Sequence, residues 1–408
     1  MTYSKIGIYI LMKKIQESVM NKKLLILILG LNGFIVMADN WVVSPILPAI
    51  SGDIGTTVTK AGILISAYMI PFGIFQLLFG PMADRYGKRQ VISISMIAFT
   101  VATALCAIGS GMTDLSIYRA LTGAFAAAVM PISLALIGDI FPMEERQTAI
   151  GTFMGISFLG QGLSMAIGGT ISYYLNWRGV FALYAVMSII TTGMLLTIGR
   201  KIPSSANKNA GFFAPYKQIF SVKSNVILYL TVLAEGILII GSFSYLGGFI
   251  DHTFHYNYLY IGLIMTLFGV FAVVGGRMSG KLAAKAGRMA VLRIGLLFAG
   301  MADILLFLSG GKLGFVMAGI GLLGLGFMLA HSSLLTLATE AAQKARGAAM
   351  SLVAFCFMGG GGVGTAIGGK IIESNGYTGL FVLYGGLIVV LLVFVTAVFS
   401  RVTCAQQA

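Results

Sequence analysis

Long apolar stretches recur along the whole chain, and no other feature of the sequence constrains its fold as strongly. A stretch of about 20 apolar residues is long enough to cross the hydrocarbon core of a bilayer as a helix. The 408-residue chain is 58% hydrophobic and only 10% charged, whereas about 25% of the residues of a soluble protein are charged. The sequence therefore predicts a multi-pass membrane protein.

The apolar stretches predict helices rather than the strands of a barrel. Lipid cannot satisfy backbone hydrogen-bonding groups, so only helices or a closed barrel span a membrane. Barrel strands alternate apolar and polar residues, and runs such as "LLILILGLNGFIVM" do not. We predict an all-α protein with twelve transmembrane helices, over residues 24–48, 60–80, 90–109, 115–138, 148–172, 178–198, 225–250, 258–280, 290–309, 313–338, 348–371 and 378–400.

The longest polar interruption, residues 199–224, divides these helices into two sets of six. We predict a cytoplasmic extension over 1–23, a bundle over 24–198, a cytoplasmic linker over 199–224, a second bundle over 225–400 and a cytoplasmic tail over 401–408. Met20 followed by "NKK" resembles a natural beginning, so residues 1–19 are interpreted as an extension.

The basic residues predict which side of the membrane each loop faces. With both termini in the cytoplasm, most of the 27 lysines and arginines lie on the inside, as the positive-inside rule requires. We therefore predict a cell-membrane protein with both termini cytoplasmic. The same asymmetry accounts for the net charge of +14, so the basic balance does not indicate a nucleic-acid partner.

The two halves match at a constant offset of 200 residues. "AIGGTIS" at 166–172 recurs as "AIGGKII" at 366–372, and "WRGVFALYA" at 177–185 matches "YTGLFVLYG" at 377–385. Duplicated six-helix halves are typical of transporters that hold their substrate between the halves.

The stretch "GPMADRYGKRQV", at 80–91, resembles the signature loop between the second and third helices of the major facilitator superfamily. Its partner in the second half, "GKLAAKAGRMAV" at 280–291, has Ala284 where the first copy has Asp84. The resemblance implies a latch for the outward-open state, with Asp84 against the helix that begins near Gly347. Because glycine permits tight turns and close approach, these roles are given to Gly80 and Gly87. The predicted gating residues are Gly80, Asp84, Arg85, Gly87, Lys88, Arg89, Arg146 and Arg346.

Further motifs resemble the drug:proton antiporters of that superfamily. "YRALTGAFAA" places Arg119 and Gly123 at positions of their helix 4 motif, and "ADNWVVSPILP" at 38–48 resembles the end of their helix 1. "GQGLSMAIGG" keeps only part of their helix 5 motif, because Ser164 and Met165 stand where Gly-Pro would be. This departure leaves open an exporter or symporter of a sugar, a nucleoside or another metabolite.

Three ionisable residues are candidates for proton coupling, because an ionisable group at mid-bilayer costs about 2.5–3.5 kcal/mol and needs a partner or a function. Asp39 and Glu235 are predicted proton carriers. Arg119 stays charged, so it is predicted to act on a carboxylate. The alternatives are a structural ion pair for Asp39, a neutral hydrogen-bonded acid for Glu235 and a position at the membrane interface for Arg119. Asp303 is on a helix that in the family faces scaffold.

A lipophilic substrate is expected to contact aromatic and polar side chains that face the cavity between the halves. His331, near mid-membrane, can titrate near physiological pH. The predicted substrate-binding residues are Asp39, Asn40, Trp41, Tyr68, Phe72, Phe243, Tyr245 and His331, with Met69 as a further candidate.

We therefore predict a secondary active transporter, acting as a monomer, that exchanges protons for small lipophilic or cationic molecules. The proton gradient is its energy source, and no cofactor or metal is predicted. The sequence has no phosphate-cradling loop, no zinc-binding spacing and no nucleophile elbow, so an enzyme is not predicted. A non-transporting membrane receptor is the alternative from another class, but the longest loop, 199–224, is short for a receptor domain.

Overall fold

The structure is a computed structural model that describes residues 22–201, 214–342 and 346–407. All the regular elements in these three ranges are helices. The predicted extension over residues 1–19 and residues 202–213 of the predicted linker lie outside the described residues.

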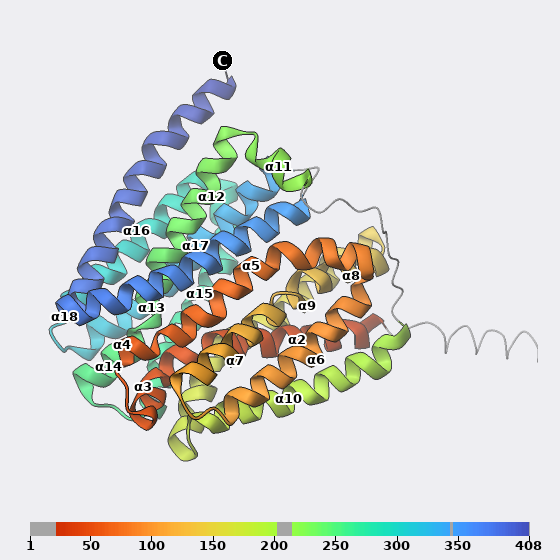
Figure 1. Cartoon of the computed structure of the whole chain (residues 1–408). Coiled ribbons are helices and arrows are strands. Elements are labelled where there is room, and N and C mark those ends of the chain that lie inside the picture. The colour runs from red at the N-terminus through yellow and green to blue at the C-terminus, as the bar shows by residue number, and fades with distance from the viewer. Residues whose placement is uncertain (1–21, 202–213, 343–345, 408) are drawn as a thin grey trace, which may run out of the picture.

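The N-terminal bundle consists of nine helical segments (Figure 1). Their bounds are α2 Lys22–Trp41, α3 Val43–Ile54, α4 Val58–Ala61, α5 Ile63–Tyr86, α6 Lys88–Ala107, α7 Met112–Ala126, α8 Val129–Ile140, α9 Met143–Tyr174 and α10 Trp177–Thr197.

The described parts of the linker are the 3-10 helix η1 Ile198–Lys201 and the helix α11 Ala214–Phe220. The C-terminal bundle follows, and it includes one π-helical segment, η2. Its bounds are α12 Lys223–Glu235, η2 Gly236–Ile240, α13 Gly241–Ser244, α14 Leu246–Phe254, α15 Tyr258–Ala286, α16 Arg288–Phe307, α17 Leu313–Ala341 and α18 Arg346–Gln407.

The described residues contain 11 segments long and apolar enough to cross a membrane. The last of them, Gly347–Val398, has 52 residues, whereas a membrane span needs about 20. The backbone turns inside it at Gly376, where φ is 69°, a conformation that glycine adopts most readily. The helix α18 therefore makes two spans, and the prediction of twelve transmembrane helices is confirmed.

Prolines explain why two spans are broken into shorter helices. Pro45 has no N–H group to donate to the carbonyl of Trp41, four residues earlier, and α2 ends at Trp41. Pro131 has the same relation to Ala127, at the break between α7 and α8. Each break lies within a predicted membrane span, 24–48 or 115–138.

The internal repeat predicted from sequence is visible in the connections between helices. Gly87 and Gly287 occupy the turns before α6 and α16, with φ of 97° and 82°. At the opposite ends of these spans, Thr57 before α4 and Asn257 before α15 each accept a hydrogen bond from a backbone N–H three residues later. Both pairs are separated by 200 residues, so the two halves repeat their capping as well as their spans.

The two bundles meet at the end that holds α3, α4, α14 and the Gly376 turn, called here the closed end (Figure 1). Thr59 Oγ1 donates to Glu373 Oε1 across the bundles at 2.9 Å, and Ser44 Oγ donates to the Phe243 carbonyl at 2.9 Å. The opposite end, with α11 and the turns at Gly87 and Gly287, is called the linker end. The structure is therefore a conformation in which the closed end is sealed.

At the linker end, the ion pairs of the described residues each join two helices of one bundle. They are Lys22–Glu145, Lys88–Asp139 and Arg288–Glu340. A link between the linker and the first bundle is the hydrogen bond that Tyr216 donates to the Leu77 carbonyl, at 3.0 Å. The linker end is thus held mainly within the bundles.

Close packing between α9 and α2 gives a testable prediction about Gly160. A Cβ at this position would lie 2.1 Å from the Phe34 carbonyl oxygen, whereas Gly151 of the same helix has nothing within 4 Å. Gly160→Ala is expected to destabilise the protein by about 1–3 kcal/mol, as overpacking does, although alanine favours helices. Thermal unfolding of the purified protein checks this, with Gly151→Ala as control; equal midpoints for the two variants would contradict the packing.

Candidate substrate and proton site

Asp39 and Arg119 form a buried ion pair inside the N-terminal bundle. Arg119 Nη1 lies 2.7 Å from Asp39 Oδ2, and the two side chains are 1% and 0% exposed. Arg119 Nη2 also donates to the Asp39 carbonyl at 3.2 Å, near the break that Pro45 causes. The face of Tyr68 lies 4.3 Å from the guanidinium, a favourable cation–π distance.

Glu235 and His331 form the corresponding pair inside the C-terminal bundle. His331 Nδ1 lies 3.1 Å from Glu235 Oε2, and the carboxylate is fully buried. Glu235 is the last residue of α12, directly before the π-helix η2, and π-helical turns often occur at functional sites. The role of His331 as a substrate contact stays a prediction; the structure places it as the partner of Glu235.

Each carboxylate keeps one buried oxygen without a hydrogen-bond partner, Asp39 Oδ1 and Glu235 Oε1. A buried polar atom without a partner is costly, so such atoms often mark the place of a water, an ion or a ligand. Both predicted proton carriers therefore have an oxygen available to a further group.

An aromatic cluster lies where the two bundles meet and reaches the Glu235–His331 pair. Trp41 lies two residues after Asp39, and its ring centroid lies 5.1 Å from that of Phe243 and 6.0 Å from that of Phe327. The ring of His331 lies 5.4 Å from Phe327 and 4.3 Å from Phe357. One aromatic side chain of the first bundle thus packs among those of the second.

A small cavity of about 10 Å³ lies beside this cluster, which is about the space of one water. It is lined by Asn40, Trp41, Ser44, Ile65, Met69, Ile240, Phe243 and Ser244. The buried Asn40 Oδ1 and Trp41 Nε1 have no hydrogen-bond partner. The residues that line this small cavity therefore carry one buried acceptor and one buried donor to which a bound group could form hydrogen bonds.

The structure brings four of the predicted substrate residues, Asn40, Trp41, Phe243 and His331, to this centre. Tyr68 lies under Arg119 instead, with Phe72 stacked on it at 5.9 Å. Tyr245 donates to the Thr365 carbonyl at 2.9 Å, and its hydroxyl oxygen lies 3.4 Å from the Thr59 carbonyl oxygen, toward the closed end. Three aromatic residues of the cluster were missed from the sequence: Phe268, Phe327 and Phe357.

The signature stretch at 80–91 is mostly helical, because α5 continues to Tyr86. Gly80 makes no turn, because it lies inside α5. A Cβ there would meet nothing within 4 Å, so a close contact of Gly80 in the outward-open state stays a prediction. Gly87 alone makes the turn. Asp84 is exposed, and within the described residues it has no hydrogen bond or ion pair.

Lys88 of this stretch forms an ion pair with Asp139 at the end of α8, at 2.5 Å. Arg85 is exposed, with its guanidinium 5.8 Å from the Tyr86 ring. Arg146 donates to the Phe141 carbonyl at 3.3 Å. The side chain of Arg346 lies outside the described residues.

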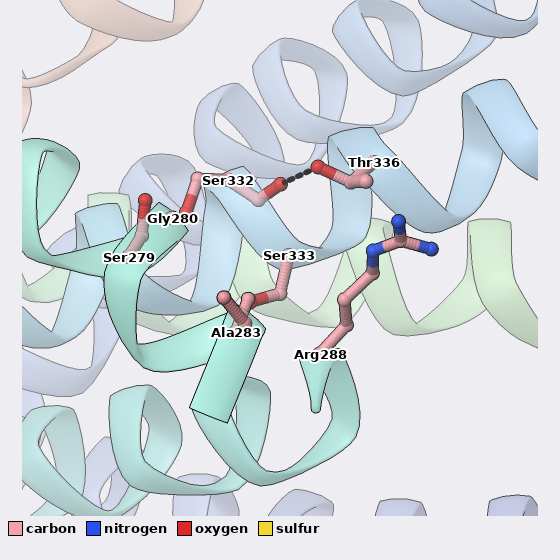
Figure 2. Close-up of a pocket in the computed structure, with 8 residues that line it drawn as sticks. Ser279, Gly280, Ala283, Arg288, Ser332, Ser333 and Thr336 are labelled. Atoms are coloured by element: carbon pink, nitrogen blue, oxygen red, sulfur yellow. Dashed lines mark hydrogen bonds between the residues drawn. The ribbon is translucent and has the colours of Figure 1, made fainter. Parts of the chain in front are cut away.

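The second half repeats this ion pair, since Arg288 after Gly287 pairs with Glu340 at the end of α17. Beside it lies a pocket of about 360 Å³ between α15, α16 and α17 (Figure 2). At the equivalent positions the first half has large buried side chains, Phe79, Ile132 and Leu136, where the second has Ser279, Ser332 and Thr336.

Asp303 of α16 is the other buried carboxylate in the C-terminal bundle. It accepts a hydrogen bond from Ser242 Oγ at 3.0 Å, and its Oδ1 atom has no partner. In the described residues no cluster of His, Cys, Asp and Glu has the arrangement of a metal site.

Two six-helix halves, related by a repeat and holding buried ion pairs next to their interface, define a membrane transporter. A family model described as the Major Facilitator Superfamily matches residues 29–356 and 249–403. The chain therefore belongs to the Major Facilitator Superfamily, and it is a transporter rather than an enzyme.

Individual relatives agree with this assignment. The chain is 26% identical to the MFS-type transporter YceJ of Bacillus subtilis over 359 residues, which are 85% of this chain and 88% of that protein. It is 34% identical to the multidrug transporter protein MdtP of the same organism over 185 residues, 44% of this chain and 33% of that protein. The structure of the nucleoside transporter NupG has the same fold, with a TM-score of 0.78, 15% identity and coverage of 92% of this chain and 99% of that chain.

Proposed function

We propose that this protein exports small lipophilic or cationic compounds in exchange for protons, by alternating access. The observation that carries the proposal is that each bundle holds one buried carboxylate paired with a base. The pair in the C-terminal bundle touches, through His331, the aromatic cluster at which the bundles meet. The similarity to a protein named as a multidrug transporter supports the substrate class.

The two pairs are proposed to have different roles. Arg119 keeps its charge at all physiological pH values, so we propose that its pair with Asp39 holds helices α2 and α7 in the positions that transport requires. This role replaces the carrier role predicted for Asp39 from the sequence. His331 can gain or lose a proton near neutral pH, so the Glu235–His331 pair can exchange one. Substrate and proton would then compete at Glu235, and competition of this kind couples two ligands.

The substrate is proposed to bind between Trp41 and the aromatic residues of the second bundle. Aromatic faces attract cations and pack against lipophilic groups. The neighbouring cavity of about 10 Å³ is too small for such a substrate, so the bundles must separate there to admit it.

The linker end is proposed to face the cytoplasm of the cell membrane, as the distribution of basic residues predicts. The sealed closed end then faces outward, and the present conformation is inward-facing. We propose that one chain is the functional unit, since each pair and the cluster between them are formed by a single chain.

Efflux from proteoliposomes with an imposed pH gradient tests the proposed function. A panel of lipophilic cations, neutral drugs and nucleosides is loaded, and export is compared with and without the gradient. Gradient-dependent export of the lipophilic cations and the neutral drugs is expected. Export of nucleosides alone, or export that is indifferent to the gradient, would contradict the proposal.

Asp84→Asn is expected to slow transport severalfold while changing substrate affinity less than twofold. Asp84 is exposed in this conformation. Its proposed partner is a helix N-terminus, which attracts anions, and the two are proposed to meet only in the outward-open state. Initial efflux rates and equilibrium binding measure the two effects, with Asp53→Asn at the other end as control. A large loss of affinity with normal cycling would refute the latch.

A further inference from the structure

The helices α9 and α15 pack tightly near the closed end and separate toward the linker end. A Cβ on Gly169 would lie 2.4 Å from the Tyr258 carbonyl oxygen, and a Cβ on Gly269 would lie 2.8 Å from the Gly162 Cα. Farther along α9, a Cβ on Gly155 would meet nothing within 4 Å. The two helices therefore form a wedge that opens toward the linker end.

This wedge, called here the α9–α15 groove, has a volume of about 580 Å³. That volume is within the range of pockets that bind drug-sized molecules. Most of its lining is apolar, including Ile156, Phe158, Leu159, Ala272, Val273 and Met328. Leu159 and Val273 are 56% and 40% exposed, so the groove opens at the surface of the bundle, where lipid would lie.

Arg277 is the charged residue among those that line the groove. It lies inside the membrane-spanning helix α15, nine residues before the helix ends at Ala286 and three residues before the end of the predicted span 258–280. Its side chain is exposed and, among the described residues, has no ion-pair or hydrogen-bond partner. A charged residue within a span is costly, and its presence indicates a site for a ligand or a counter-charge.

Gln161 supplies a second polar group at the narrow part of the groove. This side chain lines the groove, is 5% exposed, and its buried Nε2 atom has no hydrogen-bond partner. Since an unpaired buried donor is costly, the amide indicates a place for an acceptor on a bound molecule. Gln161 and Arg277 thus lie near opposite ends of one apolar groove.

The internal repeat shows that the equivalent place in the first half is covered by the chain itself. Position 277 of α15 corresponds to Leu77 of α5, at the offset of 200 residues. The linker helix α11 lies there, and Tyr216 donates a hydrogen bond to the Leu77 carbonyl at 3.0 Å. No described segment makes a corresponding contact at Arg277, which leaves the groove open to a ligand.

We propose that the α9–α15 groove binds a single-chain organic anion, with its anionic group at Arg277 and its apolar chain along the groove. A hydrogen-bond acceptor near the far end of the ligand bonds to Gln161. Charge-assisted hydrogen bonds from arginine to a carboxylate are strong and specific. The inference rests on the proposed function and deepens it, because it adds lipophilic anions to the substrates and gives them an entrance from the membrane.

Equilibrium binding of decanoate to the full chain in phosphatidylcholine nanodiscs tests the anionic group. Arg277→Gln is expected to weaken binding at least tenfold, and Lys285→Gln, an exposed cation of the same helix, less than twofold. Binding of decyltrimethylammonium, which has the same chain and the opposite charge, should not weaken in Arg277→Gln. Equal losses of decanoate binding in both variants would show a general charge effect and overturn the proposal.

The same assay tests Gln161 and the identity of the ligand. 10-Hydroxydecanoate is expected to bind more tightly than decanoate, and Gln161→Leu should remove this difference without reducing decanoate binding. If discs with phosphatidylglycerol abolish decanoate binding, a membrane lipid occupies the groove and the proposal is overturned. Because binding needs no pH gradient, this result is independent of whether proton-driven export is observed.

Discussion

Asp39→Asn is expected to destabilise the protein by about 3–5 kcal/mol and to abolish transport, because breaking a buried ion pair leaves an uncompensated charge. Arg119 is 1% exposed and lies 2.7 Å from Asp39. Its guanidinium stays charged in the variant and keeps the ring of Tyr68 at 4.3 Å and the backbone carbonyl of residue 39 at 3.2 Å, but it loses its charged partner. Unfolding in denaturant, followed on the purified protein, measures the loss.

The matched control is Asp53→Asn, which removes a carboxylate from an exposed pair. Arg178 lies 2.5 Å from Asp53, and the two side chains are 34% and 47% exposed. The hydrogen bonds from Arg178 and Trp177 hold the pKa of Asp53 below its usual range, but exposed pairs contribute only about 0–1 kcal/mol. If Asp39→Asn is no more destabilising than Asp53→Asn, the buried pair does not stabilise the bundle.

A double variant separates the structural role of this pair from its role in transport. Asp39→Leu with Arg119→Met removes both charges, and replacing a buried pair by apolar residues is often neutral or stabilising. We expect the double variant to regain most of the lost stability but not transport. Gradient-driven export at the wild-type rate by the double variant would show that the pair is structural only.

Glu235→Gln is expected to abolish export against a concentration gradient while leaving substrate exchange across the membrane within about threefold of wild type. Glutamine keeps the shape and one hydrogen bond to His331 but cannot exchange a proton. Gradient-driven export and substrate counterflow in the same proteoliposomes measure the two activities separately.

The control for Glu235→Gln is Asp303→Asn, which removes another buried carboxylate of the same bundle. Asp303 accepts from Ser242 rather than from a base, so this variant should keep its coupling to the pH gradient. If Glu235→Gln exports drug down a proton gradient at the wild-type rate, Glu235 is not the carrier. If both variants lose the coupling of export to the pH gradient, the loss follows from removing any buried carboxylate of this bundle and does not identify Glu235 as the carrier.

Much of the fold could be predicted because the length of an apolar span and a repeat at a constant offset can be read directly from the sequence. The twelve spans and the repeat at 200 residues were predicted in this way. The end of the second span was not, since a glycine between two apolar runs favours a turn by composition and the predicted span 60–80 stops at Gly80. Only the continuation of α5 to Tyr86 shows that Gly87 makes the turn alone.

The sequence indicated the individual ionisable residues of the site but not the pairs that they form. Asp39, Arg119 and Glu235 stand out because charges are rare in apolar runs. Their partners depend on which helices meet, and His331 lies 96 residues after Glu235. Phe268 and Phe357 are ordinary apolar residues in sequence, and only the approach of Trp41 from the other bundle distinguishes them.

The central claim is that substrate and proton compete at Glu235, and proton release on substrate binding tests it most directly. Purified protein in weakly buffered solution is mixed with a substrate identified in the efflux panel, and a pH indicator reports the protons released. The account predicts release by the wild type and by Asp303→Asn, and none by Glu235→Gln. Equal release by wild type and Glu235→Gln, or binding without release in the wild type, would contradict it.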